Sequence, residues 1–218
     1  MSKTTEILEK SQRFIEDLEK KNQKLDIIIE NAGLSMRCAF EEYPFENHEY
    51  MTKVNYEGPV IHTKVVLPHF LKNKRGQIVL INSVSGLLAP GLRSSYAGSK
   101  HALKGFFDSL RVELNEQNIQ ITQIYPGYVQ TNISKNALMD KPGQSLGKTD
   151  GNIAQGQDVK IFCQEVVKCI YWKIQDKVIT QKFIHKLGAK LRYIIPDYIH
   201  QSIYKNIKQQ IQAFNQSK

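Results

Sequence analysis

The sequence has few cysteines and no long apolar run. Its three cysteines, Cys38, Cys163 and Cys169, show neither the spacing of a metal site nor that of a thiol redox motif, so we expect no bound metal. An odd number of cysteines without a disulfide framework favours a reducing, intracellular environment. The N-terminus, MSKTTEILEK, is polar rather than an apolar signal segment, and no run approaches the roughly 18 to 20 apolar residues of a membrane span. We therefore predict an intracellular protein that is not secreted.

The positive charge is unevenly placed. From Lys173 to Lys218 there are nine Lys or Arg residues against two acidic ones, which gives +7 of the total net charge of +9. This argues against a uniformly basic nucleic-acid-binding protein, and the basic region has no recognisable platform of stacking aromatic residues. We expect no nucleic-acid partner. The basic region is interpreted either as a solvated helix or as a patch attracted to anionic lipid or to an acidic partner.

The apolar residues follow an alternating pattern. With 218 residues and 41% apolar composition, a single core is the default. Short β-branched runs at 25–29, 76–83 and 119–127 suit strands that are buried on both faces of a parallel sheet. Helical patterns of 20 or more residues, at 48–72 and 96–116, separate these runs. The alternation predicts an α/β fold with a mainly parallel sheet.

The flanking regions are less regular. Residues 4–23 carry one apolar stripe among charges, which predicts a helix. Residues 132–158 are rich in polar residues and predict a lid or a disordered segment. A helix at 158–174, a short strand at 177–180 and a helical tail broken near Pro196 follow.

Polar residues gather where the predicted strands end. The first strand runs into Asn31-Ala32-Gly33, the second into Ser83 and Ser85, and the third into Pro126-Gly127. Asn55 lies inside the long helix between the first two strands. The carboxyl ends of parallel strands form the edge where open α/β folds bind ligands. The sequence therefore predicts a ligand site at this edge.

Tyr96 and Lys100 lie four residues apart, which stacks their side chains on one face of a helix. The spacing alone is weak evidence, because a second pair of this kind, Tyr204 and Lys208, occurs near the basic C-terminus. The surroundings separate the two pairs. Tyr96 follows Ser83 by thirteen residues, and Ser85 competes with Ser83 as its partner.

The ordered set of motifs resembles the short-chain dehydrogenase/reductase superfamily. It comprises the Asn-Ala-Gly turn, the helix asparagine, the serine, Tyr-x-x-x-Lys and Pro-Gly-x-Val-x-Thr, and it covers roughly residues 25–131. The stretches SSYAGSKHALKGFFDSLRVEL and YPGYVQTNISKNAL are most similar to the dehydrogenase/reductase member-seven branch. The later DKVIT and the basic C-terminal extension fit that branch more loosely.

The resemblance implies catalytic roles for four residues. Tyr96 would be the acid/base that exchanges a proton with the substrate oxygen while hydride moves to or from nicotinamide. A free phenol has a pKa near 10, and Lys100 with the positive nicotinamide would lower it. Lys100 would also bind the nicotinamide ribose. Ser83 would polarise the carbonyl oxygen, and Asn55 would position a water in a proton relay.

The resemblance also implies a nicotinamide cofactor, NADP or NAD, whose type the sequence does not reveal. Pro126, Gly127, Val129 and Thr131 would line the nicotinamide, with Thr131 reaching its carboxamide. Asn31, Ala32 and Gly33 would pass beneath the adenosine.

The glycine-rich turn that cradles the cofactor pyrophosphate in this superfamily is not in the sequence. Only about 24 residues precede the first strand, and Glu30 stands where the family commonly has an asparagine. We therefore expect an incomplete Rossmann-like doubly wound parallel sheet without its first three strands. The predicted units are a dehydrogenase domain at 1–180 and a basic helical C-terminal extension at 181–218.

The incomplete sheet has consequences for association and binding. The strand at 25–29 would become an exposed apolar edge, which predicts a homo-oligomer or a partner chain that covers it. Cofactor binding would be weak. An incomplete reading of a longer gene, a degenerate relative and a second chain at the open edge all remain as explanations.

The predicted function is an NAD(P)-dependent oxidoreductase that interconverts an alcohol and a carbonyl on an apolar steroid-, retinoid- or lipid-like molecule, weak or inactive as a truncated chain. The alternative is a catalytically silent scaffold or complex subunit. Phe183, Tyr193, Ile194 and Ile195 among lysines suggest peripheral contact with the endoplasmic reticulum or another membrane surface.

Overall fold

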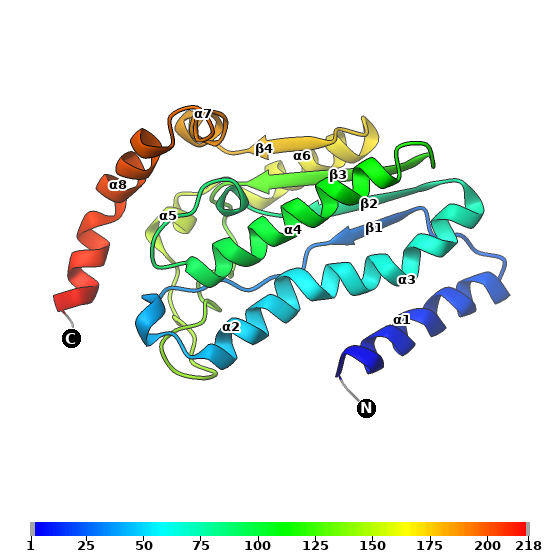
Figure 1. The fold of residues 1–218 in the computed structure, drawn as a ribbon, viewed down its shortest axis with the longest axis horizontal. Coiled ribbons are helices and arrows are strands. Elements are labelled where there is room, and N and C mark those ends of the chain that lie inside the picture. The colour runs from blue at the N-terminus through cyan, green and yellow to red at the C-terminus, as the bar shows by residue number, and fades with distance from the viewer. Residues whose placement is uncertain (1–2, 217–218) are drawn as a thin grey trace.

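The sheet is parallel throughout and forms the centre of the protein. In the computed structural model, which describes residues 3–216, it has four strands: β1 (Ile27–Glu30), β2 (Gly76–Ile81), β3 (Ile119–Pro126) and β4 (Asp176–Ile179). The strand order is β1-β2-β3-β4, and each neighbouring pair is parallel. All strands therefore end at the same edge (Figure 1). The predicted α/β class with an incomplete Rossmann-like parallel sheet is confirmed.

Helices cover both faces of the sheet. Helices α3 (Gly58–Asn73) and α4 (Ser94–Glu113) lie on one face, and α6 (Val159–Tyr171) packs on the other (Figure 1). Alternation along β2 separates the two layers, because successive strand side chains point to opposite faces. The first layer is formed by Ile78 and Leu80 with Phe70, Leu103, Phe107 and Ile121, and the second by Val79 with Ile124, Phe162, Val166 and Ile179.

The helix predicted at 4–23 is α1 (Lys3–Lys20), and it packs along α3 at the β1 edge. His69 of α3 links α1 to α3 and to the segment that precedes β1. Its Nδ1 lies 3.2 Å from Oε1 of Glu19, and its Nε2 accepts a hydrogen bond from the Leu25 backbone at 3.2 Å. As predicted, β1 is an edge strand, and Ile27 and Ile29 are 41% and 50% exposed.

The segment at 132–158 is packed against the rest of the protein, so the disordered alternative is wrong, and the lid stays a prediction. Leu138 forms a bridge to Met36, and Val129 forms one to Gln157. The short helix α5 (Gly151–Ala154) ends the segment. The side chains that anchor it are buried: Ser134, Ala137, Leu138 and Ile153.

The C-terminal region forms two helices, α7 (Phe183–Leu191) and α8 (Pro196–Gln216), separated near Pro196 as predicted. Both helices contact the segment that follows β2, through Ala189 against Leu87 and through Ile199 against Val84 and Leu88. Figure 1 shows α8 beside the edge at which the strands end. The division of the chain at residue 180 stays a prediction.

Candidate active site

Helix α4 places Tyr96 and Lys100 on its buried face. Tyr96 is 6% exposed and Lys100 is 4% exposed. Nζ of Lys100 donates a hydrogen bond to the carbonyl of Ile81, the last residue of β2, at 3.2 Å. The pair therefore lies at the carboxyl end of the sheet, where the sequence predicts the site. Tyr204 of the second pair is half-exposed on α8.

Ser83 meets Tyr96 at this edge. It follows β2 and begins the 3₁₀ turn Val84–Gly86, where its hydroxyl accepts a hydrogen bond from the Ser85 backbone at 3.0 Å. Hydrogen bonding by the Ser83 side chain also lowers the pKa of the Tyr96 hydroxyl, which places the two side chains next to each other. The structure thus brings Ser83, Tyr96 and Lys100 together from a strand end and one helix.

Asn55 is fully buried and ties the segment after β1 to α4. It lies in a π-helical turn, Lys53–Glu57, between α2 (Phe45–Thr52) and α3. Its Oδ1 accepts from the Leu34 backbone at 2.7 Å, and its Nδ2 donates to the Leu34 carbonyl and to Oγ of Ser99, both at 3.0 Å. Turns of this kind recur at functional sites. The observed bonds give Asn55 a clear positioning role, and its water-binding role stays a prediction.

The Asn31-Ala32-Gly33 segment passes beside Lys100. A Cβ at Gly33 would lie 3.4 Å from Oδ1 of Asn55 and 3.7 Å from Nζ of Lys100, so glycine keeps this space open. Asn31 and Ala32 are exposed. An ammonium group has three N–H donors, and the bond to Ile81 leaves capacity for the hydroxyls of a ribose. This arrangement fits the nicotinamide-ribose part of a dinucleotide.

The predicted Pro126–Thr131 segment lies between the ends of β3 and β4. The Gly127 backbone donates to the Ile179 carbonyl at 2.9 Å, and a Cβ at Gly127 would lie 2.4 Å from Oγ1 of Thr180, so any side chain there would collide. Val129 is buried, and Thr131 is exposed. The structure therefore places this segment at the carboxyl edge of the sheet, where the sequence predicts the site. Its contacts with the nicotinamide stay predictions.

Burial dominates the proton affinities at the site. It raises the pKa of Tyr96, and the Ser83 hydroxyl, Arg93 and Arg37 act in the opposite direction. Burial also lowers the pKa of Lys100 to about 8. Burial outweighs these three groups, because a low-dielectric environment disfavours the phenolate. The lowering of the Tyr96 pKa by Lys100 and the nicotinamide stays a prediction.

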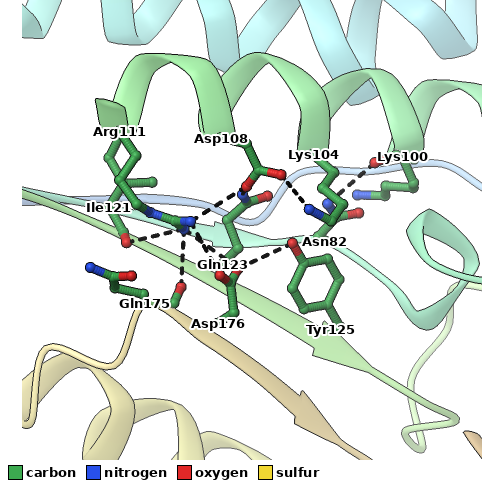
Figure 2. Close-up of polar contacts among 10 residues, drawn as sticks. All are labelled: Asn82, Lys100, Lys104, Asp108, Arg111, Ile121, Gln123, Tyr125, Gln175 and Asp176. Atoms are coloured by element: carbon green, nitrogen blue, oxygen red, sulfur yellow. Dashed lines mark hydrogen bonds and ion pairs between the residues drawn. The ribbon is translucent and has the colours of Figure 1, made fainter. Parts of the chain in front are cut away.

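Helix α4 is anchored at both ends. In its first half, Nδ2 of Asn82 donates to the Lys100 carbonyl at 3.2 Å. In its second half, Asp108 and Arg111 extend toward β3 and β4, as Figure 2 shows. Nη1 of Arg111 lies 3.1 Å from Oδ2 of Asp176, and Nε2 of Gln123 donates to Asp108 at 2.8 Å. These bonds fix the helix that carries Tyr96 and Lys100.

Several polar residues near Tyr96 are not part of any motif in the sequence. Arg93 lies one turn before Tyr96, and this spacing was the one feature of the sequence that could have indicated a contact between them. Arg37 and Asp150 come from distant segments, and only the fold joins them. The ring of Tyr128 is 6.0 Å from the Arg93 guanidinium and 5.4 Å from Nζ of Lys182.

The parallel sheet and the polar groups at its carboxyl edge define a Rossmann-like α/β protein. The family model described as short chain dehydrogenase matches residues 4–142, which is more than half of the chain. The protein belongs to the short-chain dehydrogenase/reductase family, a family of oxidoreductases.

The curated relatives carry the member-seven name. The chain is 38% identical over 172 residues to the rat dehydrogenase/reductase SDR family member 7B, covering 79% of this chain and 52% of the relative. It is 36% identical over 173 residues to a Drosophila melanogaster SDR family protein 7-like, again covering 79% and 52%. The chain thus spans about half the length of these relatives.

Solved structures agree with the fold. A short-chain dehydrogenase from Streptomyces avermitilis superimposes with a TM-score of 0.72 at 18% identity, covering 94% of this chain and 78% of that one. A 4-hydroxyisoleucine dehydrogenase complexed with NADH gives a TM-score of 0.62 at 25% identity, covering 79% and 74%. The family and the NADH-bound structure support a nicotinamide cofactor, with NAD or NADP left open.

Proposed function

We propose that the protein interconverts an alcohol and a carbonyl on an apolar small molecule, a steroid, retinoid or lipid, with Tyr96 as the acid/base. One observation carries this proposal. The Tyr96 hydroxyl, the Ser83 hydroxyl and the Lys100 ammonium group converge at the carboxyl edge of the sheet. Such a group of titratable side chains with shifted pKa values at a ligand-binding edge is typical of active sites.

The protein's own residues would handle the proton. A bound nicotinamide supplies or accepts the hydride. In the reducing direction, Oη of Tyr96 donates its proton to the substrate oxygen, and the Ser83 hydroxyl hydrogen-bonds the same oxygen. Lys100 would hold the ribose through the donors that face Gly33. In the oxidising direction, the Tyr96 phenolate takes the proton back.

The residues named above would hold the nicotinamide half of a dinucleotide, and the 218 residues contain no glycine-rich turn for the pyrophosphate. We predict that this chain binds NADPH and NADH with a Kd weaker than about 100 μM, which corresponds to roughly −5.5 kcal/mol. Calorimetric titration with each cofactor measures both affinities. Because Lys100 is the expected ribose ligand, Lys100→Met should weaken binding further. A Kd below 100 μM would contradict this prediction.

A catalytically silent scaffold is the second candidate, and the open edge at β1 favours it. Ile27 and Ile29 are exposed there, and an unpaired strand invites another chain. A homo-oligomer or a covering partner stays a prediction. The test is oxidation of NADPH by the purified chain with apolar ketones and aldehydes at millimolar cofactor. Turnover favours the enzyme, and a stable complex without turnover favours the scaffold.

We further propose that α7 and the start of α8 contact an anionic membrane surface. Lys182, Lys186 and Lys190 are exposed beside large apolar side chains, a combination that suits the boundary between headgroups and acyl chains. The exposed apolar residues are Phe183, Ile184, Leu187, Tyr193, Ile194, Ile195 and Tyr198. Among the helices described here, none has the length and apolar character needed to cross a bilayer.

Vesicle flotation tests the membrane proposal. We expect binding to vesicles that contain phosphatidylserine, and we expect Lys186→Glu with Lys190→Glu to reduce it, because each exposed lysine near an anionic surface contributes about 1 kcal/mol. The same charge changes at Lys10 and Lys20 of α1 are the matched control. Binding that is insensitive to salt and to the α7 changes would contradict the electrostatic part, and no binding would contradict the proposal.

A further inference from the structure

Three charged side chains from distant parts of the chain meet beside Tyr96. Nε of Arg37 lies 3.2 Å from Oδ2 of Asp150, and Nη2 of Arg93 lies 3.5 Å from the same oxygen. We call Arg37, Arg93 and Asp150 the Arg-Asp-Arg cluster. The Arg37 side chain is 14% exposed, that of Arg93 is 13% exposed and that of Asp150 is 18% exposed. Two guanidinium groups share one carboxylate, so the cluster carries a net positive charge.

The backbone holds Arg37 in place. Nη1 of Arg37 donates to Oγ of Ser35 at 2.8 Å and to the Met36 carbonyl at 2.7 Å. The backbone of the same segment pairs with the packed segment at 132–158, since Arg37 N donates to the Leu138 carbonyl at 3.1 Å and Leu138 N donates to the Ser35 carbonyl at 2.8 Å. The guanidinium is therefore fixed rather than free to turn to solvent.

Asp150 is fixed in the same way. Its backbone N–H donates to Oγ of Ser134 at 3.1 Å, and its Oδ1 accepts from the Asn152 backbone at 2.8 Å. Burial raises the pKa of Asp150, but the Asn152 N–H and the two arginines outweigh it and lower the pKa overall. Asp150 therefore stays ionised and holds both cations.

The cluster is built around Tyr96. Arg93 directly precedes α4, and its carbonyl accepts from Ala97 N at 2.8 Å, so it lies one turn before Tyr96. Tyr96 packs with Met36 and Leu138, which belong to the segments that carry Arg37 and Asp150. The same three segments therefore enclose the phenol and supply the charges beside it.

The other charged or titratable neighbours do not replace the arginines. Lys100, with its pKa lowered to about 8 by burial, loses charge as the pH rises, whereas arginine stays protonated. Cys38 and Tyr43 pack in the same apolar cluster, and burial first and then Cys38 raise the pKa of Tyr43 to about 12. The Ser83 side chain also lowers the pKa of Tyr96, but it carries no charge.

We propose that Arg93 and Arg37, held by Asp150, are positioning residues that favour the ionised form of Tyr96. This inference rests on the proposed acid/base function of Tyr96, and it assigns part of the electrostatic role of Lys100 to two arginines outside the motif. Arg93 and Arg37 both act electrostatically to lower the pKa of Tyr96 against the effect of burial. The packed segment at 132–158 thereby takes part in tuning the phenol, because it supplies Asp150.

A titration of Tyr96 in the whole chain tests the inference without turnover. The protein is labelled with 3,5-difluorotyrosine, whose acidic phenol titrates at a pH that the fold tolerates, and followed by fluorine NMR. Of the ten tyrosine signals, that of Tyr96 is identified by its loss in Tyr96→Phe. We expect a higher titration midpoint in Arg93→Gln and in Arg37→Gln, and a midpoint near that of the wild type in Arg93→Lys.

A purely structural role predicts the opposite sign. If the substitutions merely loosened the packed segment, water would reach Tyr96, the effect of burial would shrink and the midpoint would fall. An unchanged or lower midpoint in both glutamine variants, with native circular dichroism, would overturn the inference. Lys182→Gln removes a cation that lies over the Tyr128 ring and does not act on the pKa of Tyr96, so it is the matched control and should leave the midpoint unchanged. If the midpoints shift as expected but the protein shows no turnover, the proposed oxidoreductase function is refuted and the role of the two arginines is not.

Discussion

Replacing Tyr96 with phenylalanine should lower kcat/KM for carbonyl reduction by about 10² to 10⁴-fold, the usual contribution of a positioned acid/base. The substitution removes only the hydroxyl. The ring would keep its contacts with Met36 and Leu138, so the fold and the cofactor affinity should stay near those of the wild type. Initial rates at a fixed millimolar NADPH concentration, with unfolding curves of both proteins, measure the effect.

The second Tyr-x-x-x-Lys pair offers a matched control. Tyr204 is half-exposed on α8 and has the same sequence spacing to Lys208, so Tyr204→Phe should leave the rate unchanged. A Tyr96→Phe protein with wild-type turnover would remove Tyr96 from its assigned role. A wild-type chain without turnover at any cofactor concentration would instead favour the scaffold.

The sequence predicted the frame of the fold because burial on a sheet leaves a strong periodic signal. The runs at 25–29, 76–83 and 119–127 became β1, β2 and β3 with shifts of a few residues, and the short run at 177–180 became β4. Their order along the chain is also their order in the sheet. A parallel sheet places all strand ends at one edge, so the meeting of Ser83 with Tyr96 followed from topology.

The electrostatics of the site were not predictable in the same way. The pKa of Lys100 depends on how completely α4, β2 and the Gly33 segment exclude water, and a motif does not contain that information. The joining of Arg37 with Asp150 depends on a long-range backbone pairing between two irregular segments. Irregular segments have no period, so their partners become visible only in the folded chain.

The break in the long helix is a third feature that pattern alone concealed. The period at 48–72 suits one continuous helix, yet the structure has α2, the π-helical turn Lys53–Glu57 and α3. The turn places Asn55 where its amide meets both Leu34 and Ser99. A local irregularity is thus held by tertiary hydrogen bonds, which outweigh the intrinsic preference for a regular helix.

Arg111→Ala should lower the free energy of unfolding by about 2–3 kcal/mol, the largest stability loss that we expect from removing a single polar side chain. Removing one partner of a buried ion pair typically costs 3–5 kcal/mol, and the partial exposure of Asp176 reduces this value. Arg111 also donates to the carbonyls of Ile121 and Gln175, which would lose a partner. Figure 2 shows these contacts converging between α4, β3 and β4.

Chemical denaturation of three variants separates the contribution of the Arg111 charge from that of its apolar stem. Arg111→Met keeps most of the apolar stem, so a loss similar to that of Arg111→Ala would assign the effect to the guanidinium. Lys168→Ala breaks an exposed pair with Glu165 on α6 and should leave the unfolding free energy unchanged, because surface ion pairs contribute little. An Arg111→Ala protein as stable as the wild type would show that α4 does not depend on this network.

Because the network fixes the far half of the helix that carries Tyr96, a stability loss in Arg111→Ala should be accompanied by a lower kcat.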